Sequence, residues 1–119
     1  MKNTLLIGAS ENPERYAYKA IQALVKHGHP VKALGLKEGS IGFVKFDTKK
    51  LPYQNIDTVT LYVGPKNQPE YYEYVEQLKP RRVLFNPGTE NPEFEERLKK
   101  NGIEVEEACT LVLLATGQY

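Results

Sequence analysis

The sequence predicts an α/β domain: a doubly wound, mainly parallel five-stranded sheet with helices on both faces. Short apolar runs that end at glycine or at Asn-Pro-Gly alternate with segments of helical periodicity along the chain. Strands that alternate with helices in this way build a parallel sheet with both faces covered. The 119 residues suit one domain, so we expect a single domain over residues 1–119.

Five short apolar runs have the composition of buried strands, which are apolar on both faces in a parallel sheet. They cover residues 4–7, 31–34, 58–63, 82–85 and 103–105. Residues 36–56 are interrupted by Gly39, Gly42 and Pro52, and residues 41–46 alternate only in part. We therefore expect a loop with a short extended piece in that segment.

Helical periodicity fills the segments between the strands. In residues 13–27 the apolar side chains recur three and four residues apart, with charged side chains on the opposite side. Gly28 then suits a left-handed helix cap. We interpret His27 and His29 as part of this helix end, because no further metal ligands lie near them in the sequence. The other predicted helices cover residues 69–78, 92–100 and 110–116.

Composition argues against several classes of function. Sixteen basic residues against fifteen acidic ones give a net charge of +1, without the basic excess of a nucleic-acid or anionic-membrane binder. Cys109 is the single cysteine, which excludes an internal disulfide and a cysteine cluster for zinc and fits a reducing compartment. The first apolar run is too short for a signal peptide or membrane span. We expect a cytoplasmic protein with no metal.

The turn after the first strand has the features of an anion-binding corner. Gly8 and Ala9 let backbone N–H groups approach an anion closely, and Ser10 and Asn12 offer side-chain hydrogen bonds. The next residue is proline, which suits a first helical turn. The free N–H groups and positive dipole end of that helix then face the turn. Arg15 adds a planar, permanently charged partner for a phosphate.

Turn-forming residues also follow the other predicted strands, at the edge where open α/β sheets bind ligands. They are Gly8-Ala9-Ser10, Gly35, Gly64-Pro65 and Asn86-Pro87-Gly88. One such turn needs no ligand to explain it, but four at one edge favour a bound ligand. A dinucleotide fold would carry G-x-G-x-x-G and an acid after the second strand, and the chain has neither. Lys37 suits a ribose phosphate there, or is an ordinary surface charge.

No Ser-His-Asp or Cys-His arrangement follows from the spacing, so the sequence gives no catalytic residue. Cys109 follows the last strand and precedes the last predicted helix. Two interpretations of Cys109 are open: a reactive thiol, and a small buried residue. They do not exclude each other.

The order of these motifs resembles that of the small stand-alone CoA-binding proteins. These have a Rossmann-like fold and are related to the nucleotide-binding domain of the succinyl-CoA synthetase α subunit. The resemblance covers nearly the whole chain and is carried by Gly8-Ala9-Ser10, Asn12-Pro13, Arg15, Tyr18, His27-Gly28, Gly35, Ile41-Gly42, Val63-Gly64-Pro65, Asn86-Pro87-Gly88 and Cys109. It implies a module that binds coenzyme A or an acyl-CoA without catalysis. Two alternatives stay open: an NAD(P)-binding or redox-sensing module, and an interaction subunit that has lost its ligand.

The resemblance also implies which residues contact each part of coenzyme A. The phosphates would be held by Gly8, Ala9, Ser10 and Arg15, and the adenosine bordered by Gly35, Leu36 and Lys37. Val63, Gly64 and Pro65 would wall the pocket, while Tyr18, Asn86, Pro87 and Gly88 would face the pantetheine. Cys109 follows the last strand at the same edge of the sheet, so we expect it to border the coenzyme thiol if its sulfur faces the pocket. Many family members have Asn-Pro where this chain has Gly35-Leu36. Ligase activity is not implied, because the synthetase's phosphohistidine machinery lies outside this domain. A protein partner is left open.

Overall fold

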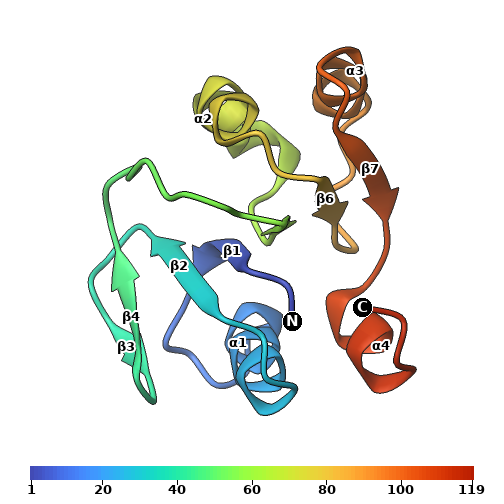
Figure 1. Ribbon diagram of the computed structural model, residues 1–119. Helices are drawn as coiled ribbons and strands as arrows, with labels where there is room; N and C mark the ends of the chain where they lie inside the picture. The colour runs from blue at the N-terminus through green and yellow to red at the C-terminus, as the bar shows by residue number, and fades with distance from the viewer.

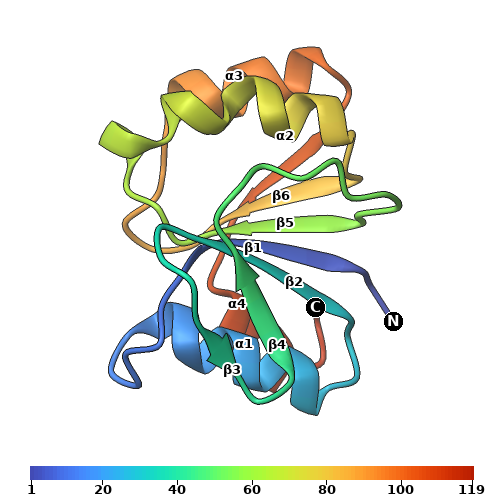
Figure 2. The ribbon, with the colours of Figure 1, turned by 90° about the vertical axis from the view of Figure 1, so that its left-hand side faces the viewer.

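The computed structural model describes residues 1–119 as a seven-stranded sheet between two layers of helices (Figures 1 and 2). The strands are β1 (Thr4–Ala9), β2 (Val31–Gly35), β3 (Ser40–Ile41), β4 (Val44–Asp47), β5 (Thr58–Leu61), β6 (Arg82–Phe85) and β7 (Glu104–Glu107). The helices are α1 (Tyr16–Lys26), α2 (Tyr72–Leu78), α3 (Pro92–Lys100) and α4 (Thr110–Ala115), with 3₁₀ turns at Pro65–Asn67 and Pro69–Tyr71. The strand order is β3-β4-β2-β1-β5-β6-β7, and all neighbours are parallel except β3 and β4.

The predicted α/β class is confirmed, but the predicted number of strands is wrong. β3 and β4 form a hairpin within residues 36–56, where the sequence predicts a loop with a short extended piece. Gly42, at φ 58°, and Phe43 make its two-residue turn, a place where glycine at the first position is favoured. β4 then pairs with β2 through Phe46 and Asp47. The hairpin owes its place to this long-range pairing, which the local alternation does not reveal.

Both faces of the central strand are covered. Leu5 and Ile7 of β1 pack on the side of α2 and α3, and Leu6 packs on the side of α1. Figure 2 shows α2 and α3 on one face of the sheet and α1 and α4 on the other. Each residue from 4 to 7 has no exposed surface, which explains why the run is apolar without alternating. No helix combines the length and apolar character needed to cross a membrane.

The first helix begins later than the sequence predicts. α1 starts at Tyr16, and the residues before it form a turn closed by a hydrogen bond from the Arg15 N–H to the Asn12 carbonyl at 3.0 Å. Arg15 is extended, with φ −80° and ψ 142°, and occupies the N-cap. The helix ends as predicted at His27 and Gly28, where φ of Gly28 is 79°.

Candidate functional site

The carboxyl ends of the central strands meet at one edge of the sheet, on the side away from the N-terminus (Figure 2). β1 lies between β2 and β5. The chain leaves β1 towards α1 on one face and leaves β5 towards α2 on the other. The loops after β1 and β5 therefore diverge, and such a point is where open α/β sheets bind ligands.

Gly8 allows β1 and β5 to come together at this point. Its φ is 104°, and a Cβ there would lie 2.7 Å from the carbonyl oxygen of Tyr62. On the side of β5 the Tyr62 N–H donates to the Ile7 carbonyl at 2.8 Å. On the other side, the ladder between β1 and β2 shifts register at Gly8, between Ile7 and Ala9. The positive φ and the close approach of the Tyr62 backbone both require glycine at this position. The neighbour is the chain's own backbone, so the glycine is needed with or without an anion.

The turn that follows is ordered by its own polar side chains. Ser10 Oγ accepts a hydrogen bond from the Asn12 N–H at 3.1 Å, and Asn12 Oδ1 accepts one from the Glu14 N–H at 3.0 Å. The Ser10 O–H remains available as a donor, whereas Asn12 acts here as a brace of the turn. The local sequence thus builds a rigid entry to α1.

The amino end of α1 leaves unpaired donors beside this turn. The backbone N–H groups of Tyr16, Ala17 and Tyr18 have no acceptor in the chain, as expected for the first turn of a helix. The Arg15 side chain is exposed directly before them. Free N–H groups, the helix dipole and a guanidinium together favour an anion.

The loop after β2 brings apolar and basic side chains to the same edge. Gly35 is buried, and a Cβ there would lie 3.0 Å from the Ala9 carbonyl oxygen. Leu36 is 87% exposed, a large apolar side chain left in water. Glu11 ties the two loops together, since its Oε2 accepts the Ser40 N–H at 2.8 Å. An exposed leucine at this position can cover a flat apolar ligand group.

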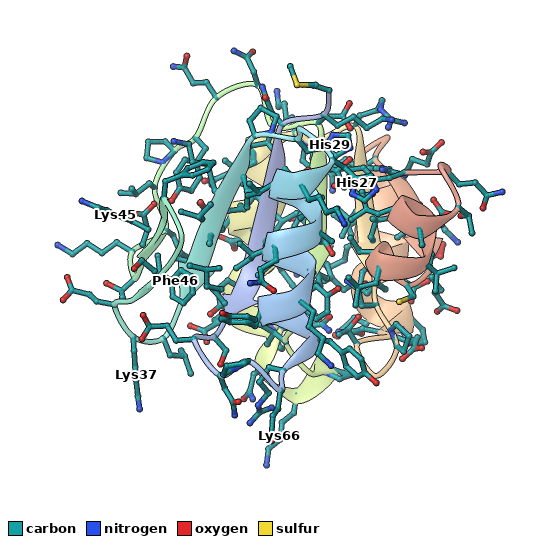
Figure 3. The ribbon with its side chains drawn as sticks, turned by 90° about the horizontal axis from the view of Figure 1, so that it is seen from below. His27, His29, Lys37, Lys45, Phe46 and Lys66 are labelled. Carbon is teal, nitrogen blue, oxygen red and sulfur yellow. The ribbon has the colours of Figure 1, made fainter.

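Two lysines place positive charge at the end of the molecule that carries the loops after β2 and β5. Figure 3 shows Lys37 and Lys66 extending from the same end of the molecule, while His27 and His29 lie at the opposite end. Lys66 follows Gly64-Pro65 and is exposed. In the sequence, the only signal that points to Lys66 is its place after a strand-ending Gly-Pro.

The loops after β5 and β6 have different surfaces. Gly64 and Gly88 face open space, the latter with φ 92°. Asn86 instead is 1% exposed, and its Nδ2 donates to Thr60 Oγ1 at 2.7 Å. Its Oδ1 accepts the Thr110 N–H at 2.8 Å. The Asn86 side chain therefore holds β5, β6 and α4 together, and the exposed part of this loop is Pro87 with Gly88.

The remaining site candidates lie around the start of α4. Tyr18 is half-buried against the cluster under α1. Cys109 is a half-buried free cysteine at the N-cap of α4, with no capping hydrogen bond from its side chain. The hydroxyl of Tyr62 is buried without a hydrogen-bond partner, and burial raises its pKa. Unpaired buried polar groups are uncommon, so Tyr62 is a further polar group at this edge.

Two hollows on the surface lie away from the candidate site residues. A hollow of about 430 Å³ lies between residues 50–55 and α2, and another of about 300 Å³ lies between α1 and the β3–β4 hairpin. No group of three or more His, Cys, Asp or Glu side chains is arranged to hold a metal. His27 Nδ1 lies 2.8 Å from the Ala23 carbonyl oxygen, which supports the interpretation of His27 as part of a helix end.

Comparison with known proteins gives one family. The family model described as a CoA binding domain matches residues 2–115. The crystal structure of an uncharacterized protein is 46% identical, with TM-score 0.98 over 100% of this chain and 98% of that one. A hypothetical protein from Pyrococcus horikoshii OT3 is 28% identical, with TM-score 0.84 over 93% and 80%. A Thermus thermophilus protein at 22% identity and TM-score 0.85, over 99% and 91%, shares the fold. No curated protein matches the chain.

Proposed function

Because the chain belongs to the family of CoA-binding domains, we propose that it binds coenzyme A or an acyl-CoA as a non-catalytic module. The ligand lies across the carboxyl edge of the sheet. The observation that supports this most directly is the corner after β1. There, unpaired N–H groups of α1 adjoin an exposed Arg15. A pyrophosphate is the part of coenzyme A that such a corner would hold.

The adenosine end is proposed to lie between the loops after β2 and β5. Leu36 is exposed there and can cover the adenine, while Val63 and Pro65 form the facing wall. Lys37, at the same end of the molecule as Lys66, suits the ribose phosphate (Figure 3). An exposed leucine and a lysine fit an adenosine that carries an extra phosphate better than one with a free ribose diol.

The pantetheine arm is proposed to run from the corner towards the loop after β6 and the start of α4. Pro87 and Gly88 border this path, with Tyr18 on the side of α1. Asn86 contributes by holding the loop, since its side-chain atoms are bonded inside the protein. Cys109, at the N-cap of α4, is proposed to border the coenzyme thiol at the far end of this path.

Thermal-shift titration with CoA, acetyl-CoA, NAD, NADP and ATP tests the proposal. A ligand at a hundredfold its dissociation constant stabilises a protein by about 2.7 kcal/mol, so CoA is expected to raise Tm clearly and more than NAD. Equal or larger stabilisation by NAD or NADP would support the dinucleotide alternative instead. Stabilisation by none of the five would favour an interaction subunit without a ligand.

A further inference from the structure

One buried side chain joins two of the loops at the ligand edge. Gln68 follows the 3₁₀ turn Pro65–Asn67 and has no exposed surface. Its Nε2 donates to the Val63 carbonyl oxygen at 2.9 Å, in the loop after β5, and to the Thr89 carbonyl oxygen at 2.7 Å, in the loop after β6. Both N–H groups of one amide therefore hold one loop against the other.

The opposite end of this amide is held from α3. Asn91 Nδ2 donates to Gln68 Oε1 at 2.9 Å and to the Tyr72 hydroxyl at 2.9 Å. Asn91 Oδ1 meanwhile accepts the Phe94 N–H at 3.3 Å as the N-cap of α3. Since Asn91 Nδ2 is a donor and faces Gln68, the Gln68 oxygen must face Asn91 and the Gln68 nitrogen must face the two carbonyls.

The strand ladder does not set the separation of these loops. Pairing between β5 and β6 ends at Leu61 and Phe85, before Val63 and Thr89 are reached. At the end of the ladder, Asn86 Nδ2 ties the start of the second loop to Thr60 and Leu61 of β5. Farther out, the Gln68 amide is the direct hydrogen-bonded link between Val63 and Thr89. Thr89 in turn closes the β6 loop, because its N–H and hydroxyl donate to the Asn86 carbonyl at 2.9 and 2.7 Å.

We propose that Gln68 is a positioning residue for the ligand site, which fixes the distance between residues 62–65 and residues 86–89. This inference rests on the proposed function, in which the adenosine contacts the first loop and the pantetheine contacts the second. A ligand that touches both loops at once gains affinity when their separation is fixed in advance, because less ordering remains to be done on binding. A fragment that touches only one loop has no such gain.

The test compares a ligand that spans both loops with a fragment that does not. Gln68→Met keeps the length and burial of the side chain and removes its hydrogen bonds. Asn91→Ser keeps a side-chain oxygen for the Phe94 N–H and removes the N–H groups that orient Gln68. The matched control is Thr4→Val, which removes a buried hydrogen bond to the Tyr119 hydroxyl at the opposite edge of the sheet.

Calorimetry with CoA and with adenosine 3′,5′-bisphosphate, which lacks the pantetheine arm, gives the readout. In Gln68→Met and Asn91→Ser we expect about tenfold weaker binding of CoA and less than about twofold change for the fragment. Thr4→Val is expected to lower Tm and to leave both dissociation constants unchanged. If Gln68→Met does not fold, Asn91→Ser supplies the same comparison.

Two results would overturn the positioning role: unchanged CoA affinity in a folded variant, or equal weakening of CoA and the fragment. The second would mean general loosening of the protein. Failure of the proposed function is a different observation, because it is read from the wild-type protein as the absence of any CoA binding.

Discussion

Arg15 is the residue on which the proposed phosphate contacts depend most. It stands at the N-cap of α1, exposed and next to three backbone N–H groups without acceptors. Arg15→Ala should weaken CoA binding by about 1.5–3 kcal/mol, the usual range for a hydrogen bond to a charged group. Stability should hardly change, because the side chain is in water. Calorimetry measures the first effect, and Lys26→Ala, an equal charge change at the other end of α1, is the control. Equal dissociation constants for wild type and Arg15→Ala would remove Arg15 from the site.

Gly8, in contrast to Arg15, contributes to the stability of the fold, whether or not a ligand is bound. An alanine there would place its Cβ 2.7 Å from the Tyr62 carbonyl oxygen, at φ 104°. Gly8→Ala should therefore cost at least about 2 kcal/mol of unfolding free energy, from backbone strain and overpacking. Gly64→Ala is the control, since a Cβ at Gly64 meets nothing within 4 Å. Urea denaturation compares the two variants, and equal stability would show that β1 and β5 can separate at this point.

At the scale of elements, local signals and long-range pairing explain what the sequence predicts and what it does not. The ends of β1 and β2 are predictable to within two residues, because Gly8 and Gly35 are needed for close backbone approaches and stand out in the sequence. The β3–β4 hairpin is not, because β4 is held by pairing with β2. Gln68 is missed for the same reason. It lies in a polar segment that looks solvated, and its burial depends on a carbonyl 21 residues away.

The hairpin itself can be checked at its turn. Gly42 has φ 58°, and space around its Cβ position is open. Gly42→Ala should therefore cost only the conformational penalty of a left-handed residue, about 1 kcal/mol. CoA affinity should stay unchanged, because this turn includes none of the proposed contacts. The unfolding free energy in urea measures the cost, and a fully stable Gly42→Ala would contradict the two-residue turn.

At the scale of the whole molecule, the carboxyl and amino ends of the strands contribute differently, the first to the proposed site and the second to stability. The carboxyl edge carries the loops proposed to bind the ligand, and the amino edge closes the fold. At the amino edge Lys2 Nζ donates to the Tyr119 carbonyl oxygen at 2.8 Å, and the Tyr119 hydroxyl lies 2.6 Å from Thr4 Oγ1. Arg82 Nη2 also donates to the Tyr119 carbonyl oxygen, at 2.9 Å. Changes at this edge should alter stability without altering the ligand contacts.

The titration of His29 can show whether stability changes at the amino end of the strands without a change in ligand affinity. Its Nδ1 accepts the Lys2 backbone N–H at 3.0 Å, and its ring lies 4.8 Å from the Tyr119 ring. Burial, and then nearby positive charges including Lys2 and Arg82, lower the pKa of His29 below 6.5. The unfolded chain then binds a proton more readily than the folded protein, so stability is fully present above about pH 6.5 and falls as the pH drops towards the folded pKa.

We therefore expect Tm to decrease between pH 7 and pH 5, and to decrease less in His29→Gln, because the glutamine cannot take up the proton. Subtracting the two curves removes the contribution of the other titrating groups. A His29→Gln curve parallel to that of the wild type would show that the neutral imidazole does not matter at this edge. The ratio of CoA affinities of the two proteins should stay constant over the same pH range, since His29 follows the carboxyl end of α1 and the proposed phosphate corner lies at the amino end of that helix.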